Sequence, residues 1–311
     1  MSALPPSKLA IDAADLTKSY GDIEVVKGID LQVRTGEIVA FLGPNGAGKT
    51  TTIEILEGFR ERDSGQVQVL GQDPALAPLA WRERVGIVLQ ESEPTPELTA
   101  LESLKMQAAY YDRPRDPLEI LELVGLSDSR DQRTRKLSGG QKRRLDLGMA
   151  LVGDPELVFL DEPTTGFDPS ARRESWVMIE ALRELGKTVL LTTHYMDEAE
   201  HLADRILVIA AGVIVANGTA AELAEQVHAT SRIVWRYDPD GLQPPNQLDW
   251  SVPDESDLAV ISGDDVVPKL HTLVGWAVDN DVALPELEVT RPTLEDVYLQ
   301  LTNSPSEATP A

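Results

Sequence analysis

The sequence predicts an α/β fold with a parallel core sheet, followed by a small α+β domain. Short apolar runs alternate with helical patterns over residues 8–222, which is typical of such folds. Residues 85–89 and 157–160 are continuously apolar, as expected for strands buried on both faces of a parallel sheet. The last 88 residues contain 16 Asp/Glu against 4 Lys/Arg, a net charge of −12. This shift in composition predicts a domain boundary near residue 223.

Length and composition bound the class of protein. A chain of 311 residues with 42% apolar and 26% charged residues is expected to be globular with two cores. It contains no cysteine and four histidines, which excludes disulfides and thiolate chemistry and argues against a histidine-rich metal site. The net charge of −24 argues against a general nucleic-acid binder. Neither a signal peptide nor an apolar run of the roughly 18 residues needed for a membrane span is visible, so a cytosolic protein is expected.

A glycine-rich loop with the spacing G-x-x-x-x-G-K-[ST] lies between an apolar strand at 37–42 and a helical pattern at 51–56. Its residues are Gly43, Pro44, Asn45, Gly46, Ala47, Gly48, Lys49, Thr50 and Thr51. Glycines allow unusual torsions and leave room for phosphate oxygens, while N–H groups at a helix start attract anions. Lys49 is expected to reach the β- and γ-phosphates and Thr50 to bind Mg²⁺. The simpler alternative, a glycine turn with a solvated lysine, does not account for four fixed positions in this context.

Several strand ends carry candidate ligand-contacting residues. Strands are expected at 9–16 and 25–33 with a turn at 21–22, and further strands at 66–71 and 85–89. Tyr20 precedes the turn, where it could stack on a nucleobase; taken alone, an ordinary turn tyrosine is the simpler interpretation. Gln90 ends a core strand, a place where polar residues meet ligands in α/β sheets. A solvated loop glutamine is an equal alternative on these residues alone.

A helical block interrupts this strand-rich pattern from residue 99 onward. Thr99 and Glu102 form a capping-box pattern, and a second helix is expected at 117–124 before the stop signal Gly125. The run Leu137-Ser138-Gly139-Gly140-Gln141 then opens a helix that extends to residue 152. A serine hydroxyl, glycine N–H groups and a helix start together form a second anion-binding device, although a plain glycine-containing helix start is common.

Two acids and a histidine follow at the ends of apolar strands. The strand 157–160 leads into Asp161 and Glu162, which fit a Mg²⁺-holding aspartate and a water-polarising glutamate. A helix at 170–185 and a strand at 188–192 lead to His194, which is placed to hydrogen-bond a γ-phosphate. Strands ending in solvated acids are the alternative. A helix at 196–203, a strand at 205–209 and a hairpin at 211–212 complete the domain.

Taken together, these segments resemble the nucleotide-binding subunit of an ABC transporter over about residues 8–222. The resemblance rests on five motifs in order: residues 43–51, Gln90, 137–141, 157–162 and His194. The glycine loop is shared by many nucleotide hydrolases, whereas Leu-Ser-Gly-Gly-Gln before an Asp-Glu strand is specific to this family. The resemblance implies a P-loop cassette with an antiparallel β subdomain and a helical insertion, here a domain of residues 1–222 with its helical part at about 99–152.

The resemblance also implies roles for individual residues, with ATP and Mg²⁺ as the bound groups. Catalysis is assigned to Glu162 as general base, His194 at the γ-phosphate and Gln90 sensing metal and water. Mg²⁺ is assigned to Thr50, Gln90 and Asp161. Nucleotide contacts are assigned to Tyr20 (stacking on adenine), Gly43, Pro44, Asn45, Gly46, Ala47, Gly48, Lys49, Thr50, Thr51, Ser138, Gly139, Gly140, Gln141 and Asp168. Ser138–Gln141 are expected to complete the site of a second copy, and Asp168 to lie in a loop at the dimer interface.

The partners implied are a separate transmembrane permease and a second ATP-binding subunit in a head-to-tail homodimer, with no nucleic acid. The permease would dock on the helical insertion, and a basic run at 130–136 is either part of that contact or a solvated face. The protein is expected in the cytoplasm, peripheral on the inner face of the cell membrane. Its expected function is ATP hydrolysis that powers export of a small molecule, lipid or polysaccharide. The alternatives are a non-transport ABC ATPase acting on nucleic acid or the ribosome, and a regulatory cassette without hydrolysis.

Residues 223–302 are expected to form an accessory α+β domain. Strands are predicted at 232–236, 258–261 and 287–289, and a helix at 266–278. The last helix carries an apolar face at i, i+3, i+4 and i+7, and residues 291–298 resemble the C-terminal segment of drug-resistance and ABC-2 exporter ATPases. The domain either controls dimerisation and docking or only stabilises the protein. Residues 303–311 are expected to be disordered.

Overall fold

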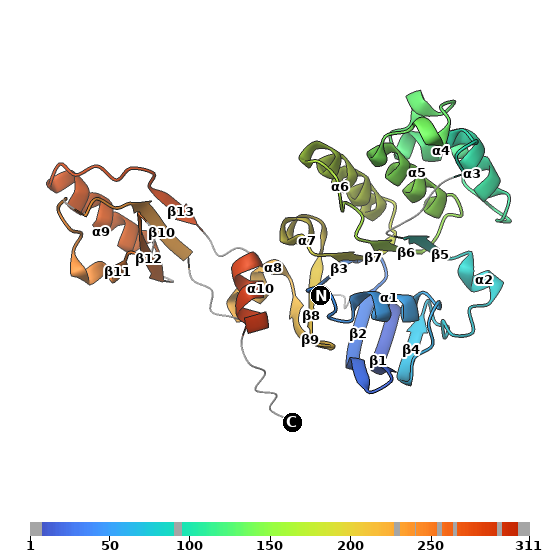
Figure 1. Ribbon diagram of the computed structural model, residues 1–311, viewed down its shortest axis with the longest axis horizontal. Helices are drawn as coiled ribbons and strands as arrows, with labels where there is room; N and C mark the ends of the chain where they lie inside the picture. The colour runs from blue at the N-terminus through green and yellow to red at the C-terminus, as the bar shows by residue number, and fades with distance from the viewer. Residues whose placement is uncertain are drawn as a thin grey trace, which may run out of the picture. The chain divides into compact units, whose positions relative to one another are not determined.

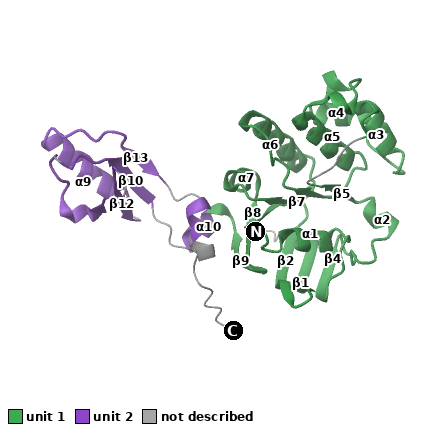
Figure 2. Ribbon diagram, in the orientation of Figure 1, with its two compact units in different colours: residues 1–220 green, residues 221–311 purple. Residues whose placement is uncertain are grey.

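The computed structural model describes residues 8–89, 95–226, 231–239, 241–253, 257–263, 266–290 and 294–303. The chain divides into two compact units, residues 1–220 and 221–311 (Figure 2). This division falls two residues before the domain boundary that the composition suggests.

The centre of the first unit is a six-stranded sheet in the order β5-β6-β7-β3-β8-β9. All neighbours are parallel except β8 and β9, which form a hairpin. Every residue of β3 and β7 is buried, because helices and a second sheet cover both faces. Parallel strands share their carboxyl edge, so the residues after β3, β6 and β7 meet there. The strands are β3 (Ile38–Leu42), β5 (Val85–Val88), β6 (Leu157–Asp161), β7 (Thr188–Thr193), β8 (Arg205–Ala210) and β9 (Val213–Gly218).

A three-stranded antiparallel sheet in the order β2-β1-β4 shares its core with the central sheet. It is formed by β1 (Leu9–Tyr20), β2 (Ile23–Arg34) and β4 (Ser64–Val69). Apolar side chains of both sheets belong to one buried cluster, in which Ile29 of β2 lies with Phe41 of β3. Two helices complete this part, α1 (Lys49–Leu56) directly after the glycine loop and the short α2 (Leu79–Arg82). This is the predicted antiparallel subdomain.

The predicted helical insertion consists of α3 (Ala100–Ala108), α4 (Pro117–Leu123) and α5 (Gly139–Leu151), which gather at one end of the unit (Figure 1). Short 3₁₀ turns at η1 (Ser127–Ser129) and η2 (Thr134–Lys136) connect α4 to α5. The three helices meet at Gly148, where an added Cβ would lie 3.1 Å from Ile120 and 3.4 Å from Leu104. Two more helices, α6 (Pro169–Glu184) and α7 (Met196–Leu202), follow β6 and β7.

The second unit is an α+β arrangement with its own core. An antiparallel sheet in the order β11-β12-β10-β13 packs against α9 around Trp235, Ile261 and Leu273. The last helix includes Asn303, so that residue is helical and not the start of a disordered end; residues 291–293 and 304–311 lie outside the described residues. The elements are α8 (Ala220–Gln226), β10 (Ser231–Arg236), η3 (Asn246–Leu248), β11 (Trp250–Ser251), β12 (Leu258–Gly263), α9 (Val266–Asp279), β13 (Glu288–Thr290) and α10 (Leu294–Asn303).

None of the helices in the described part of the chain combines the length and the apolar character that crossing a bilayer requires. The predicted fold class is confirmed: an α/β cassette with an antiparallel β subdomain and a helical insertion, followed by a small α+β region.

Candidate nucleotide-binding site

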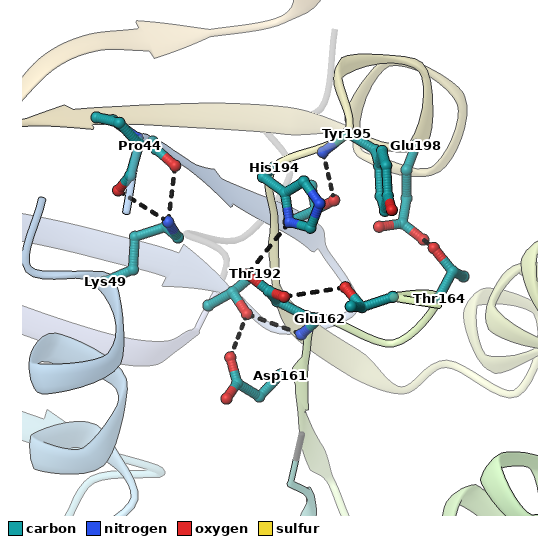
Figure 3. Close-up of polar contacts among 12 residues, drawn as sticks. Pro44, Lys49, Asp161, Glu162, Thr164, Thr192, His194, Tyr195 and Glu198 are labelled. Carbon is teal, nitrogen blue, oxygen red and sulfur yellow. Dashed lines mark hydrogen bonds and ion pairs between the residues drawn. The ribbon is translucent and has the colours of Figure 1, made fainter. Parts of the chain in front are cut away.

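A cavity of about 680 Å³ lies at the carboxyl edge of the central sheet. Its walls come from the glycine loop after β3, from the acids at the end of β6 and from the residue after β7. The sequence places these three segments far apart, and the strand order brings them together (Figure 3). The residues that line it are Asn45, Gly46, Lys49, Thr50, Asp161, Glu162, Thr165 and His194.

The glycines of the loop are required for two different reasons. A Cβ on Gly43 would lie 2.4 Å from the Ile209 carbonyl oxygen, and one on Gly48 would lie 2.7 Å from that of Val25. A side chain at either position would therefore collide with the backbone of a neighbouring segment. This packing reason comes in addition to the room for phosphate oxygens that the sequence predicts. Gly46 has open space around it but a φ of 80°, which glycine adopts at low cost.

Lys49 is buried and directed back along its own loop. Its Nζ donates to the carbonyl oxygens of Gly43 at 2.7 Å and Pro44 at 3.1 Å (Figure 3). Burial lowers the pKa of this amine, and the nearby carboxylates of Glu162 and Asp161 oppose that shift. An ammonium group has three N–H donors, so one remains for a phosphate oxygen.

The other loop residues divide by position. Asn45 and Thr50 line the cavity, whereas Thr51 lies half-buried in α1 and does not. Ala47 is buried, and its carbonyl oxygen accepts a hydrogen bond from Gly212 at 3.1 Å. The predicted roles of Ala47 and Thr51 therefore rest on their backbone and on the helix start, and not on a side chain in the cavity.

Thr192, near the end of β7, links the two acids. Its Oγ1 donates to Asp161 Oδ1 at 2.5 Å and accepts from the Glu162 N–H at 2.9 Å (Figure 3). Glu162 has a φ of 44°, a left-handed conformation that costs a non-glycine residue about 1–2 kcal/mol. The hydrogen bonds around this residue therefore hold its backbone in a conformation that it would not adopt by itself.

Both carboxylate oxygens of Glu162 have partners. Oε1 lies 3.2 Å from Nδ1 of His194, and Oε2 accepts from Thr165 Oγ1 at 2.9 Å. These contacts fix the carboxylate toward the cavity, where a water molecule can be polarised. The structure brings together Lys49, Thr50 and these acids with His194, as the sequence predicts.

Ser138, Gly139 and Gly140 line a different cavity of about 1120 Å³, together with Glu162, Thr165 and the loop that ends at Asp168. Ser138 and Gln141 form a reciprocal cap on α5: Ser138 Oγ accepts from the Gln141 N–H at 3.2 Å, and Gln141 Oε1 accepts from the Ser138 N–H at 3.0 Å. Asp168 caps α6 by accepting from the N–H groups of Ser170 and Ala171. Within one chain, Ser138, Gly139 and Gly140 do not line the Lys49 cavity.

Of the two remaining predicted residues, Tyr20 is described by the structure and Gln90 is not. Tyr20 ends β1 with 41% of its surface exposed, and the Arg60 guanidinium lies 5.3 Å from its ring centroid. One ring face thus meets a cation. Gln90 lies outside the described residues.

Sequence reasoning missed several contacts of the site. Thr165 and Thr192 hold the acids, and Arg60 lies at Tyr20. A signal for Thr192 is its position beside His194 at the end of an apolar strand, where a polar side chain is unusual. Arg60 carries no comparable signal, because nothing in its spacing relates it to Tyr20.

The donors available in the cavity fit Mg²⁺. The Thr50 hydroxyl and the Asp161 carboxylate are hard oxygen donors that line the same cavity. The described residues contain no cluster of three or more His, Cys, Asp or Glu that could hold a metal ion by themselves. One carboxylate and one hydroxyl suit Mg²⁺, which keeps water and substrate phosphates as its other ligands.

The fold and this cavity define the class of protein: an α/β cassette with a glycine loop for nucleoside triphosphates. The family model for ABC transporters matches residues 26–165. The Nod factor export ATP-binding protein I of Rhizobium etli is 38% identical over 312 residues, which cover 96% of this chain and 95% of that protein. The chain therefore belongs to the family of ABC transporter ATP-binding subunits.

Other relatives agree with this assignment. The daunorubicin/doxorubicin resistance ATP-binding protein DrrA of Streptomyces peucetius is 42% identical over 219 residues, 69% of this chain and 66% of that protein. A solved dimeric ATP-binding cassette in a post-hydrolysis state with ADP and Pi has a TM-score of 0.59 and 26% identity, and covers 67% of this chain and 98% of that one. The expected function is confirmed: an ATP-binding subunit of an ABC exporter, whose ATPase activity is coupled to transport. These relatives do not support the alternative of an ATPase acting on nucleic acid.

Proposed function

We propose that two copies of this chain join head to tail and hydrolyse ATP·Mg²⁺ at sites shared between them. Lys49 and the glycine loop of one copy hold the phosphates, and Ser138–Gln141 of the other copy close the site. The separation of Ser138 from the Lys49 cavity within one chain supports this arrangement. The solved dimeric cassette with ADP and Pi gives further support.

In this proposal Glu162 is the general base. A water molecule attacks the γ-phosphorus, the bond to the β-phosphate oxygen breaks, and Glu162 takes the proton of the water. The observation that carries the proposal is the pair of contacts on the Glu162 carboxylate, from His194 Nδ1 at 3.2 Å and Thr165 Oγ1 at 2.9 Å, which orient it in the cavity. His194 and Lys49 face the γ-phosphate, and Tyr20 stacks on adenine. Thr50 and Asp161 would hold Mg²⁺, with Gln90 as a further proposed ligand, and the ion would supply positive charge that offsets the charge of the phosphates.

The partner in the membrane is a separate transmembrane permease, which we propose docks on the helical insertion of α3–α5. The protein then acts on the cytoplasmic face of the membrane as a peripheral subunit. One relative is named for export of Nod factor, and another is named for resistance to daunorubicin/doxorubicin. An amphipathic small molecule or lipid-linked saccharide is the cargo class that we propose for this chain.

The replacement Glu162→Gln tests the base. It keeps the shape of the side chain and its contact with Thr165 while removing the carboxylate that accepts a proton. We expect ATP binding within about threefold of the unchanged protein and turnover lower by roughly 10²–10⁴-fold. ATP titration and phosphate release measure the two quantities.

The same variant tests the shared site. Because it retains ATP, it should accumulate as a dimer when ATP·Mg²⁺ saturates it, which size-exclusion chromatography with light scattering detects. A Glu162→Gln protein that stays monomeric at saturating ATP rules out the head-to-tail site. Unchanged turnover rules out Glu162 as the base.

A further inference from the structure

Arg143, two residues after Gln141 on α5, extends toward the end of the central sheet and donates to backbone carbonyls there. Its Nη2 donates to the Asp161 carbonyl oxygen at 2.6 Å and lies 3.4 Å from that of Glu162. Its Nη1 donates to the carbonyl oxygen of Leu89, at the end of β5, and its Nε lies 3.4 Å from that of Pro163. One guanidinium thus bridges the carboxyl ends of the neighbouring parallel strands β5 and β6.

Its shortest contact with β6 is on the peptide that joins the two acids. The Asp161 carbonyl and the Glu162 N–H belong to the same peptide group. Arg143 holds the carbonyl at 2.6 Å, and Thr192 Oγ1 holds the N–H at 2.9 Å. This peptide is therefore clamped from opposite sides by α5 and β7, directly before the residue with φ 44°.

An arginine suits this position better than any other residue. The guanidinium offers five N–H donors in a rigid plane, so it can serve several carbonyls at once, whereas lysine is a point donor on a flexible stem. Burial lowers the pKa of Arg143, and the carboxylates of Asp146, Asp161 and Glu162 oppose that shift. Because the ordinary pKa of arginine is so high, the group remains charged.

We propose that Arg143 is a positioning residue for Glu162, acting through the Asp161–Glu162 peptide. It fixes the left-handed backbone of Glu162 and so the direction of its carboxylate. The inference rests on the proposed role of Glu162 as the base. It adds a link from the helix that begins at Ser138 to the base of the same chain.

A purely structural role is the competing explanation, since a buried arginine also holds α5 against the sheet. The two differ in what they change. Loss of packing lowers the stability of the whole cassette, and with it nucleotide binding and turnover together. Loss of positioning lowers kcat at an unchanged affinity for ATP, because Lys49 and the glycine loop residues Asn45 and Gly46 line a different cavity from Arg143.

The test compares Arg143→Lys with Arg84→Lys in the full-length chain. Arg84 is a matched control: it lies at the amino end of β5, away from the carboxyl ends that carry the acids. Its guanidinium donates two hydrogen bonds to the Glu156 carboxylate, at 2.6 and 3.0 Å. We expect Arg143→Lys to lower kcat at least tenfold with KM for ATP and nucleotide affinity within about threefold. Arg84→Lys should keep kcat within twofold, even if its melting temperature falls by as much as that of Arg143→Lys.

A second measurement separates this inference from the proposed function. If Arg143 acts through Glu162, Arg143→Lys should cause no further loss of turnover when Glu162 is already Gln. An additional tenfold loss in that background overturns the positioning role, as does an unchanged kcat in the single variant or a parallel loss of kcat and affinity. Full activity of Glu162→Gln alone overturns instead the proposed function.

Discussion

Thr192 is the residue through which the geometry of the two acids can be changed without changing their charge. It is 2% exposed, and its hydroxyl contacts both the Asp161 carboxylate and the Glu162 N–H. Valine has nearly the same shape but no hydroxyl, so it leaves the Asp161 oxygen without this donor. A buried polar group that loses its partner costs about 1–3 kcal/mol.

We therefore expect Thr192→Val to lower kcat roughly 10- to 100-fold and stability by about 1–3 kcal/mol. Thr188→Val is the control, because Thr188 lies at the other end of β7, where its hydroxyl accepts the Gly36 N–H at 3.0 Å. It should lose similar stability and keep its turnover. Steady-state ATPase assays and urea unfolding measure both; equal turnover of the two variants contradicts the expectation.

Glu57, the residue at the end of α1, is a buried carboxyl with an unusual titration. Burial, together with the negative charges of Asp161 and Glu54, raises its pKa from 4.5 to about 8. The unfolded chain has the ordinary pKa, so the folded state binds the extra proton between about pH 4.5 and pH 8. The stability that this group contributes is thus fully present below about pH 4.5, and it is lost as the pH rises to about 8.

Glu57→Gln mimics the protonated form at every pH. Relative to this variant, the unchanged protein should lose roughly 1 kcal/mol of stability per pH unit between about pH 5 and pH 8. Urea unfolding without nucleotide or divalent metal measures the difference. Glu54→Gln is the comparison variant: Glu54 is more exposed and pairs with Arg60 at 2.6 Å, and its charge is the smallest cause of the raised pKa of Glu57, so this variant should keep most of the pH dependence. A constant difference between the two curves would mean that Glu57 titrates normally.

At the scale of elements, α3 illustrates a helix start that local sequence specifies. Thr99 accepts the Glu102 N–H at 3.2 Å, and the Glu102 carboxylate accepts the Thr99 N–H at 2.8 Å, as the capping-box pattern predicts. The N–H groups of the first helical turn have no partner inside the helix, so this cap satisfies two groups that would otherwise depend on water.

Thr99→Ala should therefore lower the stability of the protein by about 1 kcal/mol. Thr99→Ser keeps the hydroxyl and should remain within about 0.5 kcal/mol of the unchanged protein. Chemical unfolding followed by circular dichroism measures both. Equal losses for alanine and serine would show that the threonine methyl group, and not its cap, stabilises α3.

At the scale of the whole molecule, all residues of the nucleotide cavity lie within the first unit, between Asn45 and His194. Removal of residues 227–311 leaves α8 in place and should keep nucleotide affinity within about threefold. A titration with a fluorescent ATP analogue measures it. Loss of binding in a truncated protein that still melts cooperatively contradicts this expectation.

The same truncation distinguishes the two roles of the second unit. Weaker dimerisation or permease binding indicates a docking function, whereas a lower melting temperature alone indicates that the unit only stabilises the protein. The unit has its own sheet and a core that includes Trp235 and Leu273, so it is expected to fold by its own contacts.

Most elements could be predicted from the sequence, because their apolar patterns have a clear period and their ends carry turn or cap residues. The buried strand β3 and the first four residues of β6 are continuous apolar runs, β7 has an apolar centre between threonines, and α3 begins at a recognisable cap. Among the described elements, the sequence analysis did not predict β11, α2 or α8. These contain only two, four and seven residues, which is too short for a clear period.

The sequence by itself determined the nucleotide-binding loop, the two acids and the family, because these depend on fixed spacing along the chain. Only the tertiary structure decided which side chains hold the acids in place. Thr192 reaches Asp161 across 31 residues, and Arg143 reaches the Asp161 carbonyl across 18. Such contacts follow from the order of strands in the sheet and from the packing of α5 against it. Neither contact leaves a periodic pattern in the sequence, because its two residues are far apart along the chain and meet only when the sheet and α5 pack together.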